Sequence, residues 1–443
     1  MEILFIKNYK RTQMRLNIII FAHEVCPFSG SECSLGWNTI INIAKHHDLT
    51  VLHASTNQNY SVNYEKNINK FLLESSQDFK IQFIAIPQPR VNIFFSKINK
   101  ISKNYGIGFP IIYQFIYRLW LRKSLKKATA LSKENTYHIA HHINSIHIIN
   151  PSKAYKLNIP FVWGPTGGLI KLKNSFLKDL SFKVRVREIL RNTFIDFIRY
   201  FSLNFKRAVK SAELIYLFSK EDLEKVQHLT NANLKLQIDT GTVNSYKAEE
   251  NLSINNEEIK AIWVGSISSR KCPEILLKAA DKITLNGKKF SLTIVYTGEF
   301  NDALNELLLP LKNKINVVLK NNITKNEVQQ LMKESNFFIH TSYREAASAV
   351  ILEAISNGLP VICHDVSGMA LAVNDHSGIK IPLESYDLSI NLFAEAISEL
   401  INNRDMLVTK TLASFKRAEE LSWENKGLII ANDYVNIYEN SKE

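Results

Sequence analysis

The sequence of 443 residues lacks several patterns that mark well-known classes of protein. It has no uncharged apolar run of about 18 residues, so we expect no transmembrane helix. Its four cysteines, Cys26, Cys33, Cys272 and Cys363, form no C-x-x-C pair, which argues against a zinc site and a disulfide framework and favours a reducing, cytoplasmic setting. Neither G-x-G-x-x-G nor G-x-x-x-x-G-K-[ST] occurs, so dinucleotide binding and a P-loop are unsupported. No nucleic-acid-binding module is found, and we expect no nucleic acid partner.

What remains is the composition of an ordinary globular protein, 45% hydrophobic and 22% charged. A chain of this length predicts two domains of about 200 residues each. The apolar segment near the N-terminus is short and flanked by charges, so we expect no signal peptide and a fold that begins near Met14 to Leu16.

The charge is unevenly distributed along the chain. Residues 1–250 contain 35 Lys and Arg against 18 Asp and Glu, whereas residues 251–443 contain 20 against 24. This asymmetry predicts that the N-terminal half faces an anionic partner.

Strand-like and helix-like segments alternate over the whole length, which predicts parallel sheets built from βαβ units. The polar stretch 244–258 is the expected linker between two series of strands. The predicted strands are 15–22, 49–55, 80–86, 137–143, 160–164 and 213–219 in the first half, then 259–265, 290–296, 315–320, 336–342 and 359–364.

The segment HTSYREAASAVILEAISNGLPVICHDVSG (340–368) is the most informative part of the sequence. It predicts a strand end, a loop, a helix and a second buried strand, with Gly358 and Pro360 as stop signals between the last two. A loop that leads into a helix at the carboxyl end of a strand suits an anion, and carboxylates such as Glu345 and Glu353 suit sugar hydroxyls. By composition alone, two such glutamates are more often a helix-capping acid and a solvated face.

The full string, with Glu345 and Glu353 eight positions apart and then E-A-I-S-N-G-L-P-V, resembles the donor-site signature of the retaining GT-B glycosyltransferases of family 4. The resemblance implies a GT-B fold, in which two doubly wound, Rossmann-like α/β domains face a cleft. It implies an N-terminal acceptor-side domain (1–243), a C-terminal nucleotide-sugar-binding domain (244–415) and a C-terminal helix (416–443) that crosses back onto the first domain.

A second segment, WVGSISSRKCPEILLKAADKI (263–283), predicts a strand, a loop and a helix. Lys271 and Arg270 stand just before the helix, where a cation and free N–H groups can hold a diphosphate, although exposed cations usually do nothing specific. Lys271 matches the lysine of the resembled family's Gly-Arg…Lys-Gly element. Ser266 stands where that family usually has Arg, and Cys272 where it has Gly, so we hypothesise that Arg270 supplies the missing charge.

Three further segments of the N-terminal half are site candidates. Gly30 lies in the pattern P-x-x-G-S-E…G-W, which resembles a subset of the same family and lets backbone approach a bound group. Gly167 and Gly168 follow a short strand and are expected to expose backbone N–H groups, unless they form only a sharp turn. By resemblance, a histidine at the end of the strand 137–143 faces the donor sugar; His141 is the first choice and His142 the second, against the alternative of a buried, hydrogen-bonded histidine.

The resemblance also implies roles for the C-terminal residues. Glu353 would hold the ribose hydroxyls of a nucleoside diphosphate sugar, and Lys271 with Arg270 would offset the charge of the departing diphosphate. Glu345 would contact sugar and phosphates through its loop, together with Ala346, Ala347 and Ser348. No Asp-x-Asp occurs in the chain, so we expect no metal and no cofactor besides the donor itself.

Two basic, aromatic segments, 109–128 and 181–210, indicate either core helices with a solvated face or a surface that binds anionic lipid. We favour the lipid surface and expect a peripheral protein at the inner face of the cell membrane, acting on a saccharide or lipid-linked saccharide in surface polysaccharide synthesis. The implied reaction is glycosyl transfer with retention of anomeric configuration. The alternatives are a GT-B sugar-nucleotide epimerase or hydrolase, and a catalytically weak scaffold subunit of the same fold.

Overall fold

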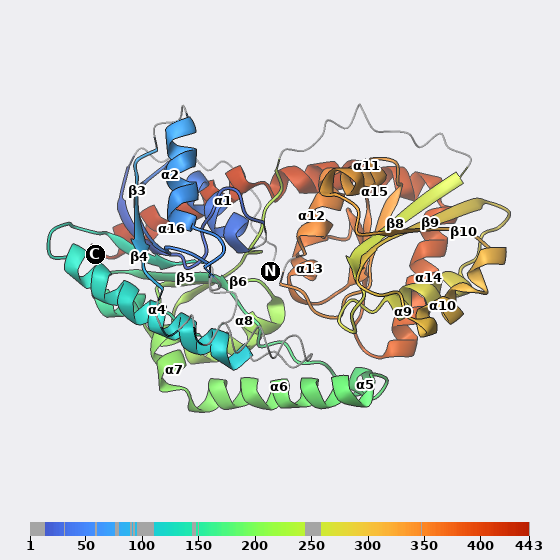
Figure 1. The fold of residues 1–443 in the computed structure, drawn as a ribbon, viewed down its shortest axis with the longest axis horizontal. Helices are drawn as coiled ribbons and strands as arrows, with labels where there is room; N and C mark the ends of the chain where they lie inside the picture. The colour runs from blue at the N-terminus through green and yellow to red at the C-terminus, as the bar shows by residue number, and fades with distance from the viewer. Residues whose placement is uncertain are drawn as a thin grey trace. The chain divides into compact units, whose positions relative to one another are not determined.

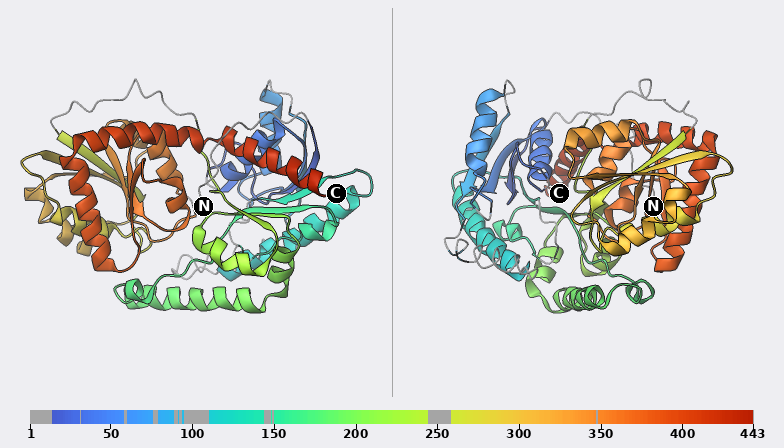
Figure 2. Two further views of the ribbon diagram at one scale, coloured as in Figure 1. Left: turned by 180° about the vertical axis from the view of Figure 1, so that it is seen from behind. Right: turned by 45° about the vertical axis from the view of Figure 1, so that its right-hand side comes forward.

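The computed structural model describes residues 14–30, 32–57, 60–75, 79–88, 91, 94, 110–143, 148, 150–243, 258–346 and 348–442. The expected linker at 244–258 lies, except for Glu258, outside them. The chain forms two compact units (Figures 1 and 2). Unit 1 comprises Met1–Leu169, Phe197–Asp239 and Trp423–Glu443, and unit 2 comprises Ile170–Asp196 and Thr240–Ser422.

Unit 1 is built on a seven-stranded parallel sheet with the order β3-β2-β1-β4-β5-β6-β7. Its first strand is the apolar run NIIIF, in which four of five residues are buried, as expected for a strand covered on both faces. The strands are β1 (Asn17–Phe21), β2 (Asp48–Ala54), β3 (Ile81–Ile86), β4 (Ile139–His142), β5 (Phe161–Thr166), β6 (Leu214–Leu217) and β7 (Asn233–Leu236).

Helices cover both faces of this sheet (Figure 1). The C-terminal helix α16 packs against α1, and its Ile430, Tyr434 and Val435 join the core around β1 and β4. The helices that lie wholly or partly in unit 1 are α1 (Glu32–Ala44), α2 (Tyr64–Glu74), α4 (Pro110–Leu131), α6 (Phe182–Phe201), α7 (Leu203–Lys210), α8 (Lys220–Val226) and α16 (Trp423–Asn440).

Unit 2 contains a six-stranded parallel sheet with the order β10-β9-β8-β11-β12-β13. α9, α10 and α14 pack together on one face, and α12 packs with α15 on the other. The strands are β8 (Glu258–Ser266), β9 (Lys289–Thr297), β10 (Asn316–Asn321), β11 (Phe337–His340), β12 (Val361–His364) and β13 (Gly378–Ile381). The helices are α5 (Asn174–Leu177), α9 (Pro273–Lys282), α10 (Asp302–Leu308), α11 (Lys325–Lys333), α12 (Ala349–Ser356), α13 (Ser367–Ala372), α14 (Tyr386–Asn402) and α15 (Arg404–Glu420).

The predicted stop between helix and strand in the segment 340–368 is confirmed. α12 ends at Ser356, Gly358 follows with φ +75°, and β12 begins at Val361. A Cβ on Gly358 would lie 2.3 Å from the ring of Phe415, so both the backbone conformation and the packing require glycine here.

Unit boundaries differ in three places from those expected from the sequence, one of which is the short stretch 240–243, which belongs to unit 2. Residues 170–196, placed in the first domain by the sequence, belong to unit 2, because Phe176 and Leu177 of α5 are buried in the core of that unit. Residues 416–422 also belong to unit 2, as the end of α15, whereas α16 belongs to unit 1. In the part of the chain that the structure describes, no helix is long and apolar enough to cross a membrane.

Candidate functional site

The middle of the unit 2 sheet is a topological switch point. β8 pairs with β9 on one side and with β11 on the other, both in parallel. Open α/β sheets bind ligands outside the carboxyl ends of their strands at such a point. The loops that follow β8 and β11, residues 267–272 and 341–348, leave the sheet there, so the structure brings the two predicted C-terminal motifs together.

Lys271 is held at the end of the first loop by a chain of hydrogen bonds. Thr341 Oγ1 donates to the Lys271 carbonyl at 2.7 Å and accepts from Trp263 Nε1 at 3.1 Å. The next residue, Cys272, has φ +47°, and Pro273 then begins α9. The backbone of Lys271 is thereby fixed to the second loop.

Glu345 forms an ion cluster with the two cations of the first loop. Lys271 Nζ lies 2.5 Å from Glu345 Oε1, and Arg270 Nη1 pairs with the same oxygen. Arg270 also donates to the Arg344 carbonyl at 3.0 Å. Burial lowers the pKa of Lys271, whereas the Glu345 carboxylate opposes that effect. One carboxylate therefore holds two cations side by side where an anionic ligand could bind.

Ser266 ends β8, and its Oγ lies 3.4 Å from Ser268 Oγ. Arg270 lies beside Lys271, as it must if it supplies the charge of the arginine that is absent at Ser266. That role stays a prediction.

Helix α12 starts at the end of the second loop. Ser348 is its N-cap residue but makes no side-chain cap hydrogen bond, so the first-turn N–H groups have no side-chain partner from this residue. Glu353 lies one turn further along, 29% exposed, with Lys325 Nζ 3.2 Å from its Oε1. Ala346 precedes this helix, and Ala347 lies outside the described residues.

His141 and His142 lie on opposite faces of β4, as strand alternation predicts, and both are fully buried in unit 1. His141 Nδ1 lies 2.5 Å from Tyr434 Oη, and its Nε2 lies 2.8 Å from the Gly164 carbonyl. Burial lowers the pKa of His141 to about 3, so the ring is neutral. Both ring nitrogens are occupied, which matches the alternative of a hydrogen-bonded core histidine; contact with a donor stays a prediction.

The glycine loops of unit 1 differ in their surroundings. The Gly168 and Leu169 N–H groups donate to the buried carboxylate of Asp222 at 3.1 and 2.6 Å, so Asp222 takes up donors that the sequence suggested for a ligand. A Cβ on Gly167 would lie 2.4 Å from Asp222 Oδ2, which gives that glycine a packing role. A Cβ on Gly30 would meet no atom of the described residues within 4 Å, so packing does not require glycine there.

Sequence reasoning missed a carboxyl pair in unit 1. Glu24, in the loop after β1, and Glu32, the first residue of α1, share a side-chain hydrogen bond. Burial, and then the Glu32 carboxylate, raise the pKa of Glu24 to about 8, so one of the two carries a proton at neutral pH. A separation of eight residues across the start of a helix gave no signal of this contact.

It also missed His340 and an ion pair beside the site. His340 ends β11 and is 1% exposed, and neither ring nitrogen has a hydrogen-bond partner among the residues that the structure describes. Burial lowers its pKa well below the usual value, with Lys271 and Arg270 adding to the effect. Arg344 pairs with Glu188 of α6 through two bonds of 2.6 and 3.2 Å. Among the described residues, no group of three His, Cys, Asp or Glu could hold a metal ion.

The two parallel-sheet α/β units and the solved structures they resemble define a GT-B fold. Sucrose-phosphate synthase from Thermosynechococcus elongatus matches with a TM-score of 0.56 at 14% identity, covering 96% of this chain and 100% of its own. WaaG, a glycosyltransferase involved in lipopolysaccharide biosynthesis, matches with a TM-score of 0.54 at 15% identity, covering 94% of this chain and 98% of its own. At these identities the likeness concerns the fold.

Residues 245–419 match the family model described as glycosyl transferases group 1. D-inositol 3-phosphate glycosyltransferase of Rhodococcus jostii is 25% identical over 186 residues, which are 40% of each chain. UDP-Gal:alpha-D-GlcNAc-diphosphoundecaprenol alpha-1,3-galactosyltransferase of Escherichia coli is 26% identical over 160 residues, 35% of this chain and 41% of its own. The chain therefore spans about two fifths of the length of these curated relatives.

Proposed function

We propose that the protein is a glycosyltransferase that moves a sugar from a nucleoside diphosphate sugar to a hydroxyl of a saccharide or lipid-linked saccharide, with retention of anomeric configuration. The observation that carries this proposal is the cluster of Lys271, Arg270 and Glu345 at the switch point of unit 2. The match of residues 245–419 to glycosyl transferases group 1 supports it.

In this proposal the donor lies over the loops after β8 and β11. Lys271 and Arg270 turn from Glu345 toward the diphosphate, and the first-turn N–H groups of α12 add further donors. Glu345 and its loop contact the sugar, and Glu353 accepts hydrogen bonds from the ribose hydroxyls. No metal is needed for charge compensation, because the two cations supply it.

The acceptor oxygen attacks the anomeric carbon from the face that the diphosphate leaves. The bond from that carbon to the phosphate oxygen breaks as the new glycosidic bond forms, and the acceptor proton passes to the departing phosphate. Cations fixed beside the leaving group stabilise the charge that develops on it. We assign no protein nucleophile.

We further propose a lipid-linked acceptor, a role in surface polysaccharide synthesis and a place at the inner face of the cell membrane. The basic excess of residues 1–250 supports an anionic surface as partner. One relative is named for a diphosphoundecaprenol-linked substrate, and the similar structure of WaaG belongs to a protein of lipopolysaccharide biosynthesis.

The first experiment is a thermal-shift screen of the full chain against UDP-, GDP- and TDP-sugars. A bound donor at about 100 times its Kd stabilises the folded state by about 2.7 kcal/mol, so one base should raise Tm clearly. If no nucleotide sugar shifts Tm, the proposed function is wrong. Turnover of the donor without acceptor would instead support an epimerase or hydrolase, and tight donor binding without transfer would support a scaffold subunit.

A further inference from the structure

Helix α6 (Phe182–Phe201) exposes an unusual amount of apolar surface. Phe182 is 79% exposed, Leu190 65% and Phe201 70%. The remaining exposed apolar side chains of the helix are Val186, Ile189, Phe194, Phe197 and Tyr200. Soluble proteins rarely leave so many large apolar side chains in water on one element, and such patches mark interaction sites.

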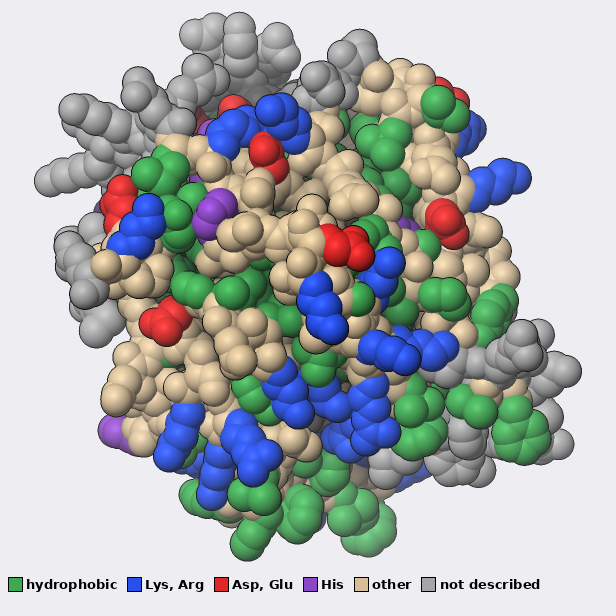
Figure 3. Space-filling view, turned by 90° about the vertical axis from the view of Figure 1, so that its left-hand side faces the viewer, with side chains coloured by type: hydrophobic (Ala, Val, Ile, Leu, Met, Phe, Trp, Pro, Cys, Tyr) green, Lys and Arg blue, Asp and Glu red, His purple; other side chains and the backbone are tan. Residues whose placement is uncertain are grey.

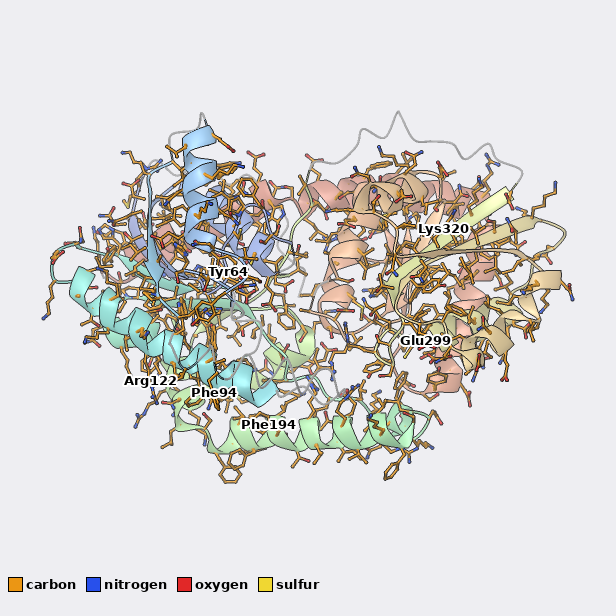
Figure 4. The ribbon with its side chains drawn as sticks, in the orientation of Figure 1. Tyr64, Phe94, Arg122, Phe194, Glu299 and Lys320 are labelled. Carbon is orange, nitrogen blue, oxygen red and sulfur yellow. The ribbon has the colours of Figure 1, made fainter. Side chains whose placement is uncertain are left out.

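These side chains lie on one side of the helix. Their spacing of three, four and seven residues gives a single apolar stripe along five turns. Figure 4, in which Phe194 is labelled, shows side chains standing out from α6 along its length. The stripe is therefore a continuous face and not a set of scattered positions.

Cations border this face, and the acids of the helix are neutralised. Lys183 and Arg187 are exposed, and Arg185 is half-buried. The acids are Glu188, which is 1% exposed and paired with Arg344, and Asp196, which pairs with Lys171. Figure 3 shows Lys and Arg side chains gathered above hydrophobic ones along the lower edge, the level at which α6 and α7 lie in Figure 1.

The inner side of the same helix contacts both loops of the candidate site. Glu188 holds Arg344, the neighbour of Glu345, through two hydrogen bonds. Arg187 Nη2 donates to Ser269 Oγ at 3.3 Å, and Ser269 directly precedes Arg270. All these contacts lie within unit 2. α6 thus carries an apolar face on one side and fixes the site loops with the other.

We propose that α6 docks on an anionic lipid bilayer through its apolar face, and that the Glu188–Arg344 pair couples this docking to the donor loops. Apolar side chains bordered by cations suit the headgroup boundary of anionic lipid. A second copy of the chain fits less well, because both copies would bring a basic border and the two acids of each helix are already paired within the chain.

The coupling part of the inference rests on the proposed function, whereas the docking part does not. We propose that the arrangement of α6 in which Glu188 holds Arg344 is favoured by bilayer binding and also binds the donor more tightly, so that the donor binds more tightly on the bilayer. By linkage, the donor must then strengthen bilayer binding by the same factor.

Co-sedimentation of the full chain with vesicles of phosphatidylglycerol and phosphatidylcholine tests the docking. We expect binding that weakens with salt, and a loss of at least about tenfold in the triple variant Phe182→Ser, Leu190→Ser and Phe201→Ser. The matched control is Leu73→Ser with Leu309→Ser, which removes exposed leucines from α2 and the end of α10 and should bind as the wild type does. Equal binding by the triple variant would overturn the docking. The docking would also be overturned if the wild type bound no vesicles and instead formed a dimer that the triple variant dissociates.

Donor affinity with and without vesicles tests the coupling. We expect vesicles to lower the Kd of the donor about fivefold or more in the wild type and to leave it unchanged in Glu188→Gln, which keeps the apolar face. If Glu188→Gln does not fold by its thermal melt, Arg344→Lys takes its place, because it keeps the charge but loses the two-bond geometry. Equal vesicle effects in wild type and variant would refute the coupling. Vesicle binding with no donor binding at all would refute the proposed function and leave the docking intact.

Discussion

The side chain of Glu345 is the centre of the candidate site, because it holds two cations at one oxygen. Lys271 is 12% exposed and Arg270 36%, so the two differ in how much water screens them. Both residues are tied to the second loop through their backbone, since the Lys271 carbonyl accepts from Thr341 Oγ1 and the Arg270 carbonyl accepts from the Tyr343 N–H. Arg270 is the more exposed of the two cations, and its side chain also donates to the Arg344 carbonyl.

Arg270→Ala tests whether this arginine replaces the one absent at Ser266. We expect a rise in the donor KM and a fall in kcat, together about tenfold or more in kcat/KM, because a charge-assisted contact to the leaving group is lost. Steady-state kinetics with varied donor measure this, with Lys320→Ala as a control that removes an exposed cation of the same unit. Unchanged KM and kcat for Arg270→Ala would end the compensation hypothesis.

The Glu24–Glu32 pair makes stability depend on pH in a defined window. The folded state holds a proton on Glu24 up to about pH 8, whereas the unfolded chain releases it near its usual pKa of 4.5. Between these values the folded state binds more protons, so the free energy of unfolding falls as pH rises and levels off above about pH 8.

In Glu24→Gln, the free energy of unfolding should fall less steeply with rising pH, because the amide keeps a hydrogen bond to Glu32 and cannot ionise. Urea unfolding at several pH values measures the slope, and Glu65→Gln, an exposed acid on α2, should leave it unchanged. A steep fall between pH 5 and 8 that persists in Glu24→Gln would show that other groups cause it.

At the scale of elements, α16 shows how a segment far along the sequence completes the first unit. Tyr434 forms a hydrogen bond with His141. Asp433 accepts a hydrogen bond from Tyr216 Oη at 2.6 Å and forms an ion pair with Lys235 at 2.5 Å. Lys426 donates to the Asp239 carbonyl at 2.7 Å, and burial lowers its pKa to about 7. Each of these three buried side chains of α16 has a partner on another segment of unit 1, which fixes the position of the helix.

Tyr434→Phe should destabilise unit 1 by about 1–3 kcal/mol, because it leaves His141 Nδ1 buried without a partner. Chemical denaturation followed by tyrosine and tryptophan fluorescence measures the loss. Tyr438→Phe, on a half-buried position of the same helix, should change stability by less than about 0.5 kcal/mol. If Tyr434→Phe and Tyr438→Phe were equally stable, the hydrogen bond between Tyr434 and His141 would not stabilise the packing of α16.

The sequence predicted the elements whose apolar runs are long and missed those that are short. The run FFIH became β11, and the eleven predicted strands all occur. β7 and β13 were missed, because NLKL and GIKI contain only two apolar residues each, separated by lysine. The segment 181–210 was interpreted from its basic and aromatic residues as a core helix or a lipid-binding surface. That the stretch 170–196 belongs to unit 2 was not predicted, because it depends on Phe176 and Glu188, whose partners lie over 150 residues away in sequence.

At the scale of the whole molecule, the GT-B fold that the motifs predicted is confirmed, and the loops of the two predicted C-terminal motifs lie at the same edge of the unit 2 sheet. Lys271 and Glu345 meet because parallel strands β8 and β11 end at the same edge of a sheet, which the strand order predicts. The sequence offered a buried, hydrogen-bonded histidine as the alternative for His141, but neither its partner Tyr434 nor the use of Asp222 by the glycine loop could be predicted, since each depends on one side chain from a distant element. Retention, acceptor and membrane location remain proposals at this scale.

The measurement that tests the central claim most directly is calorimetric titration of the full chain with the nucleotide sugar that the thermal-shift screen selects, for the wild type and Lys271→Ala. We predict one donor per chain and a Kd raised about tenfold or more in Lys271→Ala, with Tm without donor nearly unchanged. Equal affinity in the two proteins, or no heat with any nucleotide sugar, would contradict a donor site built on Lys271 and Glu345.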